Sequence, residues 1–155
     1  MSDFHFRHGL QLQEQNQYDA AYNAFVAALT AAEKALVANG VVTPESMADG
    51  DVADDEQAQR DYLNALYQIG RNAVFSQAHI EHGVSALRQF VAHVEQGEAL
   101  TGAPPLAWGY LRLAQLHSLE GENEKVMQNL TLAEKSEDKA LHEAARKLRR
   151  LYQPD

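Results

Sequence analysis

The sequence predicts an all-α protein with about seven helices. Apolar residues recur at spacings of three and four along almost the whole chain, which is the period of a helix that buries one face. Convincing period-two alternation, which would indicate strands, is absent. Short polar or glycine-containing segments interrupt the helical pattern at intervals, so most of the helices are expected in pairs joined by short hinges.

The first pair of helices is expected over about residues 3–39. One helix covers about Phe4 to Asn16, and a second covers about Asp19 to Asn39 with an apolar stripe along one side. Gly40 suits the position just after the second helix, because glycine adopts the left-handed conformation that ends many helices. The segment VVTPESMADGDVADDEQ follows, and its proline, glycine and acidic residues predict a linker.

The second pair is expected over about residues 55–97. A long helix runs from about Asp55 to Glu81, the EHG sequence at residues 81–83 is expected to break it, and a further helix runs from Val84 to about Glu95. The third pair is expected over about residues 104–135, with helices at about 106–119 and 122–135. Pro104 and Pro105 are well placed to open the first of these, because proline is tolerated in the first turn of a helix.

A last helix is expected over about residues 137–152, with Ser136 as its N-cap. Two acidic residues follow in its first turn and RKLRR closes it, which is the charge order that the helix dipole favours. A chain of 155 residues with 45% hydrophobic content is long enough to bury one core. We therefore expect a single domain over residues 1–155.

Composition narrows the classes of function. The chain has no cysteine, so disulfides and cysteine-based zinc sites are excluded. Its 13 Lys and Arg against 22 Asp and Glu give a formal net charge of −9, which opposes general binding to nucleic acid or to an anionic membrane. No apolar run has the length of a signal-peptide core or of a membrane span, so a cytoplasmic location is expected.

Two segments share one pattern of small and large residues. When the segment that begins at Tyr110 is aligned with the opening of the chain, the matched pairs are Ala114 with Gly9, Val126 with Ala21, Leu130 with Phe25 and Ala133 with Ala28. This spacing resembles the tetratricopeptide repeat (TPR), and the first helix and turn of that motif are also matched, by Tyr110, Leu113, Ala114, His117 and Gly121.

The resemblance covers about residues 3–135 and implies three hairpins stacked as a short right-handed superhelix, with residues 137–152 as a capping helix. Small residues let the two helices of a hairpin approach closely. In the middle unit Ala86 and Phe90 fit the second helix, but Ile69-Gly70 lies four residues before the expected small position. Two registers, one helical turn apart, therefore remain open for this unit.

Membership of this family would imply a protein–protein interaction module, such as an adaptor or a chaperone-like protein. TPR arrays bind an extended peptide or a helix in a concave groove that is lined by the first helix of each hairpin. Carrying the groove positions over gives Asp3, Phe6, Arg7, Leu10 and Gln13 in the first unit, Arg71, Asn72 and Phe75 in the second, and Trp108, Leu111, Arg112, Gln115 and Ser118 in the third. Arg71 faces the groove in either register, whereas Asn72 and Phe75 do so in one register only.

Three arginines, one from each hairpin, would then line one groove. A guanidinium offers forked donors that match a carboxylate, so the expected partner is a protein or peptide segment with acidic residues or a free C-terminal carboxylate. Phe4 and Phe6 lie two residues apart and cannot share one narrow helix face, so one of them is expected at the surface, where it could serve a homodimer contact. Trp108 could be either a core residue or an interface anchor.

The alternative is a metal-binding or small-molecule-binding helical protein that uses histidine pairs. His5 and His8 are three residues apart, and so are His79 and His82, so each pair could place two imidazoles on one helix face. The sequence fixes no third ligand for either pair. It also contains no nucleophile motif, phosphate loop or nucleotide fingerprint, so we predict no catalytic residue, no metal site and no cofactor.

Overall fold

The computed structural model describes residues 2–40, 42–48, 56–97 and 100–152, and the all-α class is confirmed. These ranges contain eight helices and no strand. The helices are α1 (Ser2–Glu14), α2 (Tyr18–Ala38), α3 (Pro44–Ala48), α4 (Glu56–Ser76), α5 (Ile80–Gln96), α6 (Leu106–Glu120), α7 (Asn123–Ala133) and α8 (Lys139–Arg150).

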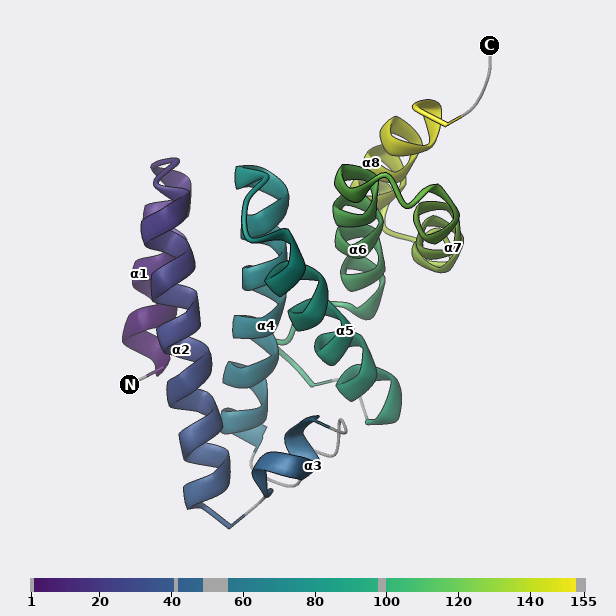
Figure 1. Cartoon of the computed structure of the whole chain (residues 1–155). Coiled ribbons are helices and arrows are strands. Elements are labelled where there is room, and N and C mark those ends of the chain that lie inside the picture. The colour runs from purple at the N-terminus through teal and green to yellow at the C-terminus, as the bar shows by residue number, and fades with distance from the viewer. Residues whose placement is uncertain (1, 41, 49–55, 98–99, 153–155) are drawn as a thin grey trace.

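The helices pack in chain order as a row of pairs (Figure 1). α1 packs on α2, α4 on α5, and α6 on α7, while α2 contacts α4 and α5 contacts α6. α8 covers α6 and α7 at the end of the row, opposite to α1. The first helices of the three pairs are also neighbours, because α4 contacts both α1 and α6.

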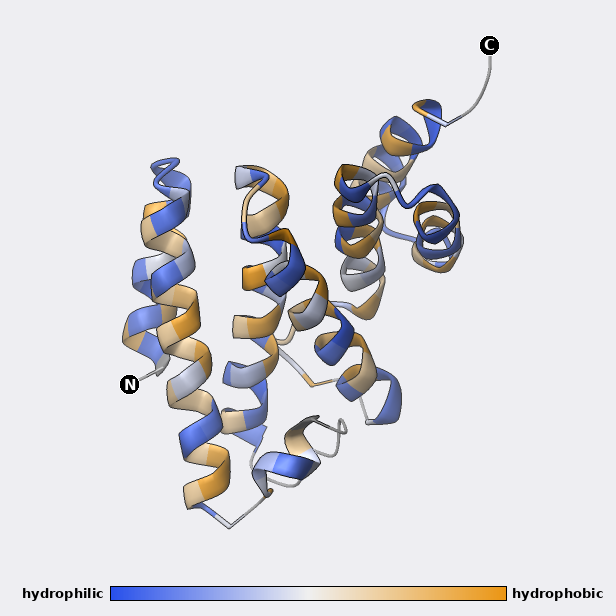
Figure 2. Cartoon of the chain, in the orientation of Figure 1, coloured by the Kyte–Doolittle hydropathy of each residue, from blue (hydrophilic) through white to orange (hydrophobic). Residues whose placement is uncertain are grey.

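The core consists of two clusters of buried side chains. The larger cluster lies among α2, α3, α4, α5 and one side of α6, and Phe25, Tyr62 and Phe90 are its largest fully buried members. The smaller cluster joins α6, α7 and α8 through Leu111, Leu130 and Leu141. Along the helices hydrophobic and hydrophilic residues are interspersed (Figure 2), as expected of helices that bury one face each. No helix in the described ranges is long and apolar enough to cross a lipid bilayer.

The predicted boundary between the two helices of the middle pair is wrong. α4 ends at Ser76 rather than near residue 81, and the turn to α5 contains Gln77 and His79, both with φ of 56°. Gly83 lies inside α5, where a Cβ atom would come within 2.8 Å of the Cβ of Ala73. The glycine therefore permits a close approach of α5 to α4 and does not end a helix.

Two further details differ from the sequence-based expectations. The segment expected as a linker contains the short helix α3, while the part of it at residues 49–55, together with the expected start of the second pair, lies outside the described residues. The N-cap of α8 is Asp138 and not Ser136, since its Oδ1 accepts hydrogen bonds from the backbone nitrogens of Ala140 (2.9 Å) and Leu141 (3.2 Å). The other predicted helix ends agree with the structure to within about two residues.

Candidate functional site

Two arginines from neighbouring helices converge on one phenylalanine. The Cζ atom of Arg71, on α4, lies 4.6 Å from the centre of the Phe75 ring, and the Cζ atom of Arg112, on α6, lies 5.5 Å from the same ring. Arg112 also lies 5.1 Å from the Trp108 ring. We call Arg71, Phe75, Trp108 and Arg112 the arginine–aromatic cluster. It lies where α4 meets α6, on the side formed by the first helices of the pairs.

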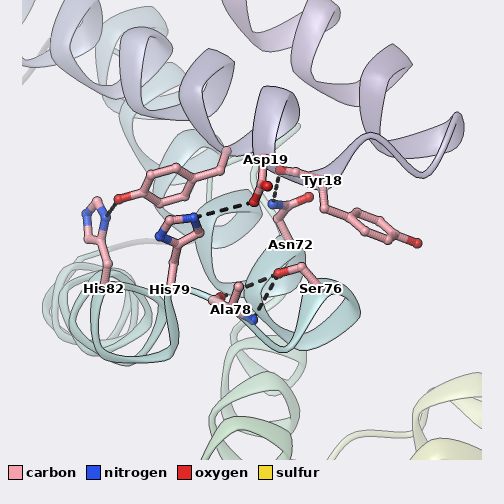
Figure 3. A network of polar contacts seen from close by, with 8 residues as sticks. Tyr18, Asp19, Asn72, Ser76, Ala78, His79 and His82 are labelled. Carbon is pink, nitrogen blue, oxygen red and sulfur yellow. Dashed lines mark hydrogen bonds and ion pairs between the residues drawn. The ribbon is translucent and has the colours of Figure 1, made fainter.

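Buried amide side chains hold Arg71 in place. Its guanidinium donates to Oε1 of Gln13, on α1, and Gln13 Nε2 donates in turn to Oδ1 of Asn72 over 3.3 Å. Asn72 completes the chain by donating from Nδ2 to the backbone oxygen of Tyr18 over 3.0 Å (Figure 3). Gln13 and Asn72 are both buried, so the position of Arg71 is fixed by contacts with α1 and with the first residue of α2.

Arg112 is oriented by its own set of contacts. Its Nε donates to the hydroxyl of Tyr67 over 3.1 Å, and its Nη1 donates to Oε1 of Gln115 over 3.1 Å. The Trp108 indole nitrogen donates to Oδ2 of Asp138 over 2.9 Å. The two cluster residues on α6 are therefore connected to α4 through Tyr67 and to the N-cap of α8 through Asp138.

The cluster carries positive charge without a neutralising carboxylate. Within the described residues, neither Arg71 nor Arg112 has a carboxylate oxygen within 4.0 Å. Burial lowers the pKa of Arg71, and the nearby charge of Arg112 lowers it further. Both effects oppose the charged form of the guanidinium. An anion bound beside the two arginines would therefore stabilise their charged forms.

The structure separates nine of the thirteen predicted groove residues into three groups. Arg71, Phe75, Trp108, Arg112 and Gln115 lie together. Asn72 and Leu111 are 1% and 0% exposed, so they support the surface from beneath and do not line it as the sequence suggested. Arg7 and Leu10, on α1, lie elsewhere: the Arg7 side chain is 78% exposed and pairs with Asp3 over 3.3 Å, while Leu10 is partly buried against the larger core cluster.

Three contributors to this site were not identified from the sequence. Tyr67 and Gln68 contact the two guanidinium groups, and Asp138 contacts Trp108. Gln68 could have been found, because Gln68, Arg71 and Phe75 follow the spacing of three and four that places residues on one helix face. Nothing in the sequence links Asp138 to Trp108, which lies thirty positions earlier.

The two histidines at the start of α5, His79 and His82, both contact Tyr22 and do not converge on a shared metal position. The rings of His79 and Tyr22 stack with centroids 3.7 Å apart, and the Tyr22 hydroxyl lies 2.7 Å from Nδ1 of His82. His79 Nε2 lies 3.8 Å from Oδ1 of Asp19 (Figure 3). Burial lowers the pKa of His82, and the neighbouring His79 lowers it further. No group of three potential metal ligands occurs among the described residues.

Comparison of the chain with protein-family models, with curated proteins and with solved structures finds no match.

Proposed function

We propose that the chain is a protein–protein interaction module, an adaptor or chaperone-like protein, that binds an acidic peptide segment or a free C-terminal carboxylate at the arginine–aromatic cluster. The observation that carries this proposal is the convergence of Arg71 and Arg112 on Phe75 without a carboxylate partner in the described part of the chain. Two guanidinium groups side by side provide forked donors for carboxylate oxygens.

The arrangement of the helices supports a TPR-like array as the scaffold of this module. Three helix pairs follow one another, the second helix of each of the first two pairs contacts the first helix of the next, and α8 closes the end of the row. In such an array the first helices line one surface, and the cluster lies on α4 and α6, which are the first helices of the second and third pairs.

Apolar contacts are available beside the charges. The Phe75 side chain is 38% exposed although both arginines lie against it, and Trp108 is partly buried at the same place. Aromatic and arginine side chains commonly anchor protein interfaces. An acidic segment with a neighbouring apolar side chain would therefore gain both charge-assisted hydrogen bonds and apolar burial.

The test uses two synthetic hexapeptides that differ only in charge. The first contains two glutamates and a free C-terminus, and the second contains two glutamines and an amidated C-terminus. Calorimetric titration should show tighter binding of the charged peptide, and this preference should shrink as salt is raised from 0.1 to 1 M, because the Debye length falls from about 10 Å to about 3 Å.

A charge-reversal variant and its control test whether the charged peptide binds at the arginine–aromatic cluster. Arg71→Glu should abolish the preference for the charged peptide, whereas Arg150→Glu, which makes the same change on an exposed residue of α8, should keep most of it. Equal binding of the two peptides by the wild-type chain, or an equal loss in both variants, would refute the proposal. Affinity capture from the native cell, repeated with Arg71→Glu, would then identify the partner.

A further inference from the structure

A cavity lies away from the arginine–aromatic cluster, between the end of α2 and the helices α3, α4 and α5. Its volume is about 570 Å³, which falls in the range of small-molecule sites in proteins. Tyr62 lines this cavity, and it lies nine residues before Arg71 on α4. Nine residues make two and a half helical turns, so the cavity and the cluster lie on opposite faces of α4.

The walls of the cavity are mostly apolar. Val37 and Ala38 come from the end of α2, and Pro44 and Met47 come from α3. Figure 1 shows α3 below α4 in this view, near the C-terminal end of α2. A ligand that filled the cavity would therefore remove hydrocarbon surface from water, which favours binding.

One carboxylate faces this apolar space. Glu33 lines the cavity and is partly buried, and among the described residues it forms neither a hydrogen bond nor an ion pair. Burial raises the pKa of Glu33 above its ordinary value. The carboxylate also lies close enough to Tyr62 for its charge to contribute to the raised pKa of the Tyr62 hydroxyl, after the larger effect of burial.

We propose that this cavity binds a small molecule that carries an ammonium group on an apolar body, with the ammonium against Glu33. The apolar walls select the body of such a ligand, and the carboxylate selects its charge, because a partly buried charge without a partner is stabilised most by an opposite charge. This site goes beyond the proposed peptide binding and does not depend on it.

Lys34 also lines the cavity, but it does not neutralise Glu33. Its side chain is exposed, and no ion pair joins the two residues. Consecutive residues of a helix point about 100° apart, so Lys34 occupies the rim while Glu33 faces the space between the helices. A ligand with a carboxylate in place of the ammonium would meet Glu33 with the same charge.

The test compares three probes with one apolar body: 2-phenylethylamine, 2-phenylethanol and 3-phenylpropanoate. Calorimetric titration of the full chain should rank the amine first and the carboxylate last. Glu33→Gln should weaken binding of the amine by roughly 10- to 100-fold, the range expected for a hydrogen bond to a charged group, and should leave the alcohol nearly unchanged. Glu124→Gln, which removes one exposed carboxylate on α7, should leave all three affinities unchanged.

The pH dependence of amine binding and a cavity-filling variant provide two further tests. Amine affinity should fall as the pH is lowered through the raised pKa of Glu33, and Glu33→Gln should remove that dependence. Val37→Trp, at a residue that is 39% exposed, should fill the cavity and weaken binding of the amine and the alcohol alike. Alcohol or carboxylate binding as tight as that of the amine, or an unchanged amine affinity in Glu33→Gln or Val37→Trp, would overturn the proposal.

Discussion

The indole nitrogen of Trp108 donates a hydrogen bond to Oδ2 of Asp138, and this 2.9 Å contact joins the first turn of α6 to the start of α8. The other carboxylate oxygen of Asp138 accepts from the backbone nitrogens of Ala140 and Leu141. The Trp108 hydrogen bond is the largest cause of the lowered pKa of Asp138, and the backbone hydrogen bonds add to it. One side chain therefore caps a helix and positions a residue of the candidate site.

Substitution of Asp138 should lower the melting temperature of the protein. Asp138→Ala removes both the N-cap of α8 and the acceptor for Trp108, whereas Asp138→Asn keeps a residue that caps helices well. We expect the melting temperature, followed by circular dichroism, to decrease in the order wild type, Asp138→Asn, Asp138→Ala. The same melting temperature for all three proteins would show that the cap contributes nothing to stability.

The stabilisation from Asp138 should depend on pH. Its folded-state pKa lies below the ordinary value of 3.8, so the ionised form stabilises the folded state. That contribution is complete above about pH 3.8 and is lost as the pH falls through the lower folded-state pKa. The difference in melting temperature between wild type and Asp138→Asn should therefore be constant from pH 7 to about 5 and should narrow below pH 3.8. A difference that widens in acid would contradict this sign.

Two leucines of α8 and its C-cap should respond very differently to truncation. Leu141 is fully buried and Leu151 is 73% exposed. Leu141→Ala should lower the free energy of unfolding by about 2–5 kcal/mol, because it leaves a cavity in the core cluster of α6, α7 and α8. Leu151→Ala should change it by less than about 0.5 kcal/mol. Denaturant unfolding of both variants would measure the contrast, and similar losses would mean that α8 does not cover the core as described.

The contact between Gly70 of α4 and Leu87 of α5 should not accept a methyl group. A Cβ atom on Gly70 would lie 2.3 Å from Cγ of Leu87, and overpacking of this kind costs about 1–3 kcal/mol. The better helix propensity of alanine would offset at most about 1 kcal/mol of this. We therefore expect Gly70→Ala to be destabilising in chemical denaturation.

The double variant Gly70→Ala/Leu87→Ala tests whether the new methyl group at residue 70 destabilises the protein through its overlap with Leu87. Leu87→Ala alone leaves a cavity, but the new methyl group at residue 70 would occupy part of it. The loss of stability in the double variant should be smaller than the sum of the two single losses, by about 0.5–3 kcal/mol. Additive losses would argue against direct contact between the two positions.

Phe75 should matter for peptide binding although it carries no charge. Its ring lies against both Arg71 and Arg112, so Phe75→Ala removes the apolar surface on which the two guanidinium groups lie. Each of these cation–π contacts is worth about 0.5–1 kcal/mol. Without them both arginines are less ordered for the ligand, and we expect a several-fold weaker affinity for the charged hexapeptide. Leu132, on α7, is exposed to nearly the same extent, 37% against 38%, so Leu132→Ala is the matched control and should bind like wild type.

Helical periodicity was sufficient for the fold class and for most of the helix limits, but not for the hinge between α4 and α5. Glycine in a sequence can mark either the end of a helix or a close approach of two helices, and Gly83 has the second role. The actual turn contains Gln77 and His79 in left-handed conformations, which non-glycine residues adopt rarely. The sequence therefore contains no local signal for a turn at these two residues.

The sequence indicated which helix faces form the candidate site, but not which residues on those faces are buried. The resemblance to the tetratricopeptide repeat implied that Arg71 and Arg112 face one groove, and in the structure both guanidinium groups lie against Phe75. Asn72 and Leu111 lie on the same helices but are buried, because Asn72 contacts Gln13 and Tyr18 and Leu111 packs in the core cluster of α6, α7 and α8. On α1, Gln13 and not Arg7 is the residue that contacts Arg71.

Trp108 is the only tryptophan in the chain, and it lies between Arg112 and Asp138. The emission of an indole responds to nearby charges and to hydrogen bonding of its nitrogen. This protein therefore contains a single indole fluorophore, whose emission would respond both to an anion bound at Arg112 and to the detachment of α8. A shift in its emission maximum on titration would report ligand binding without a label, and the same signal followed in denaturant would report when the last helix separates from α6.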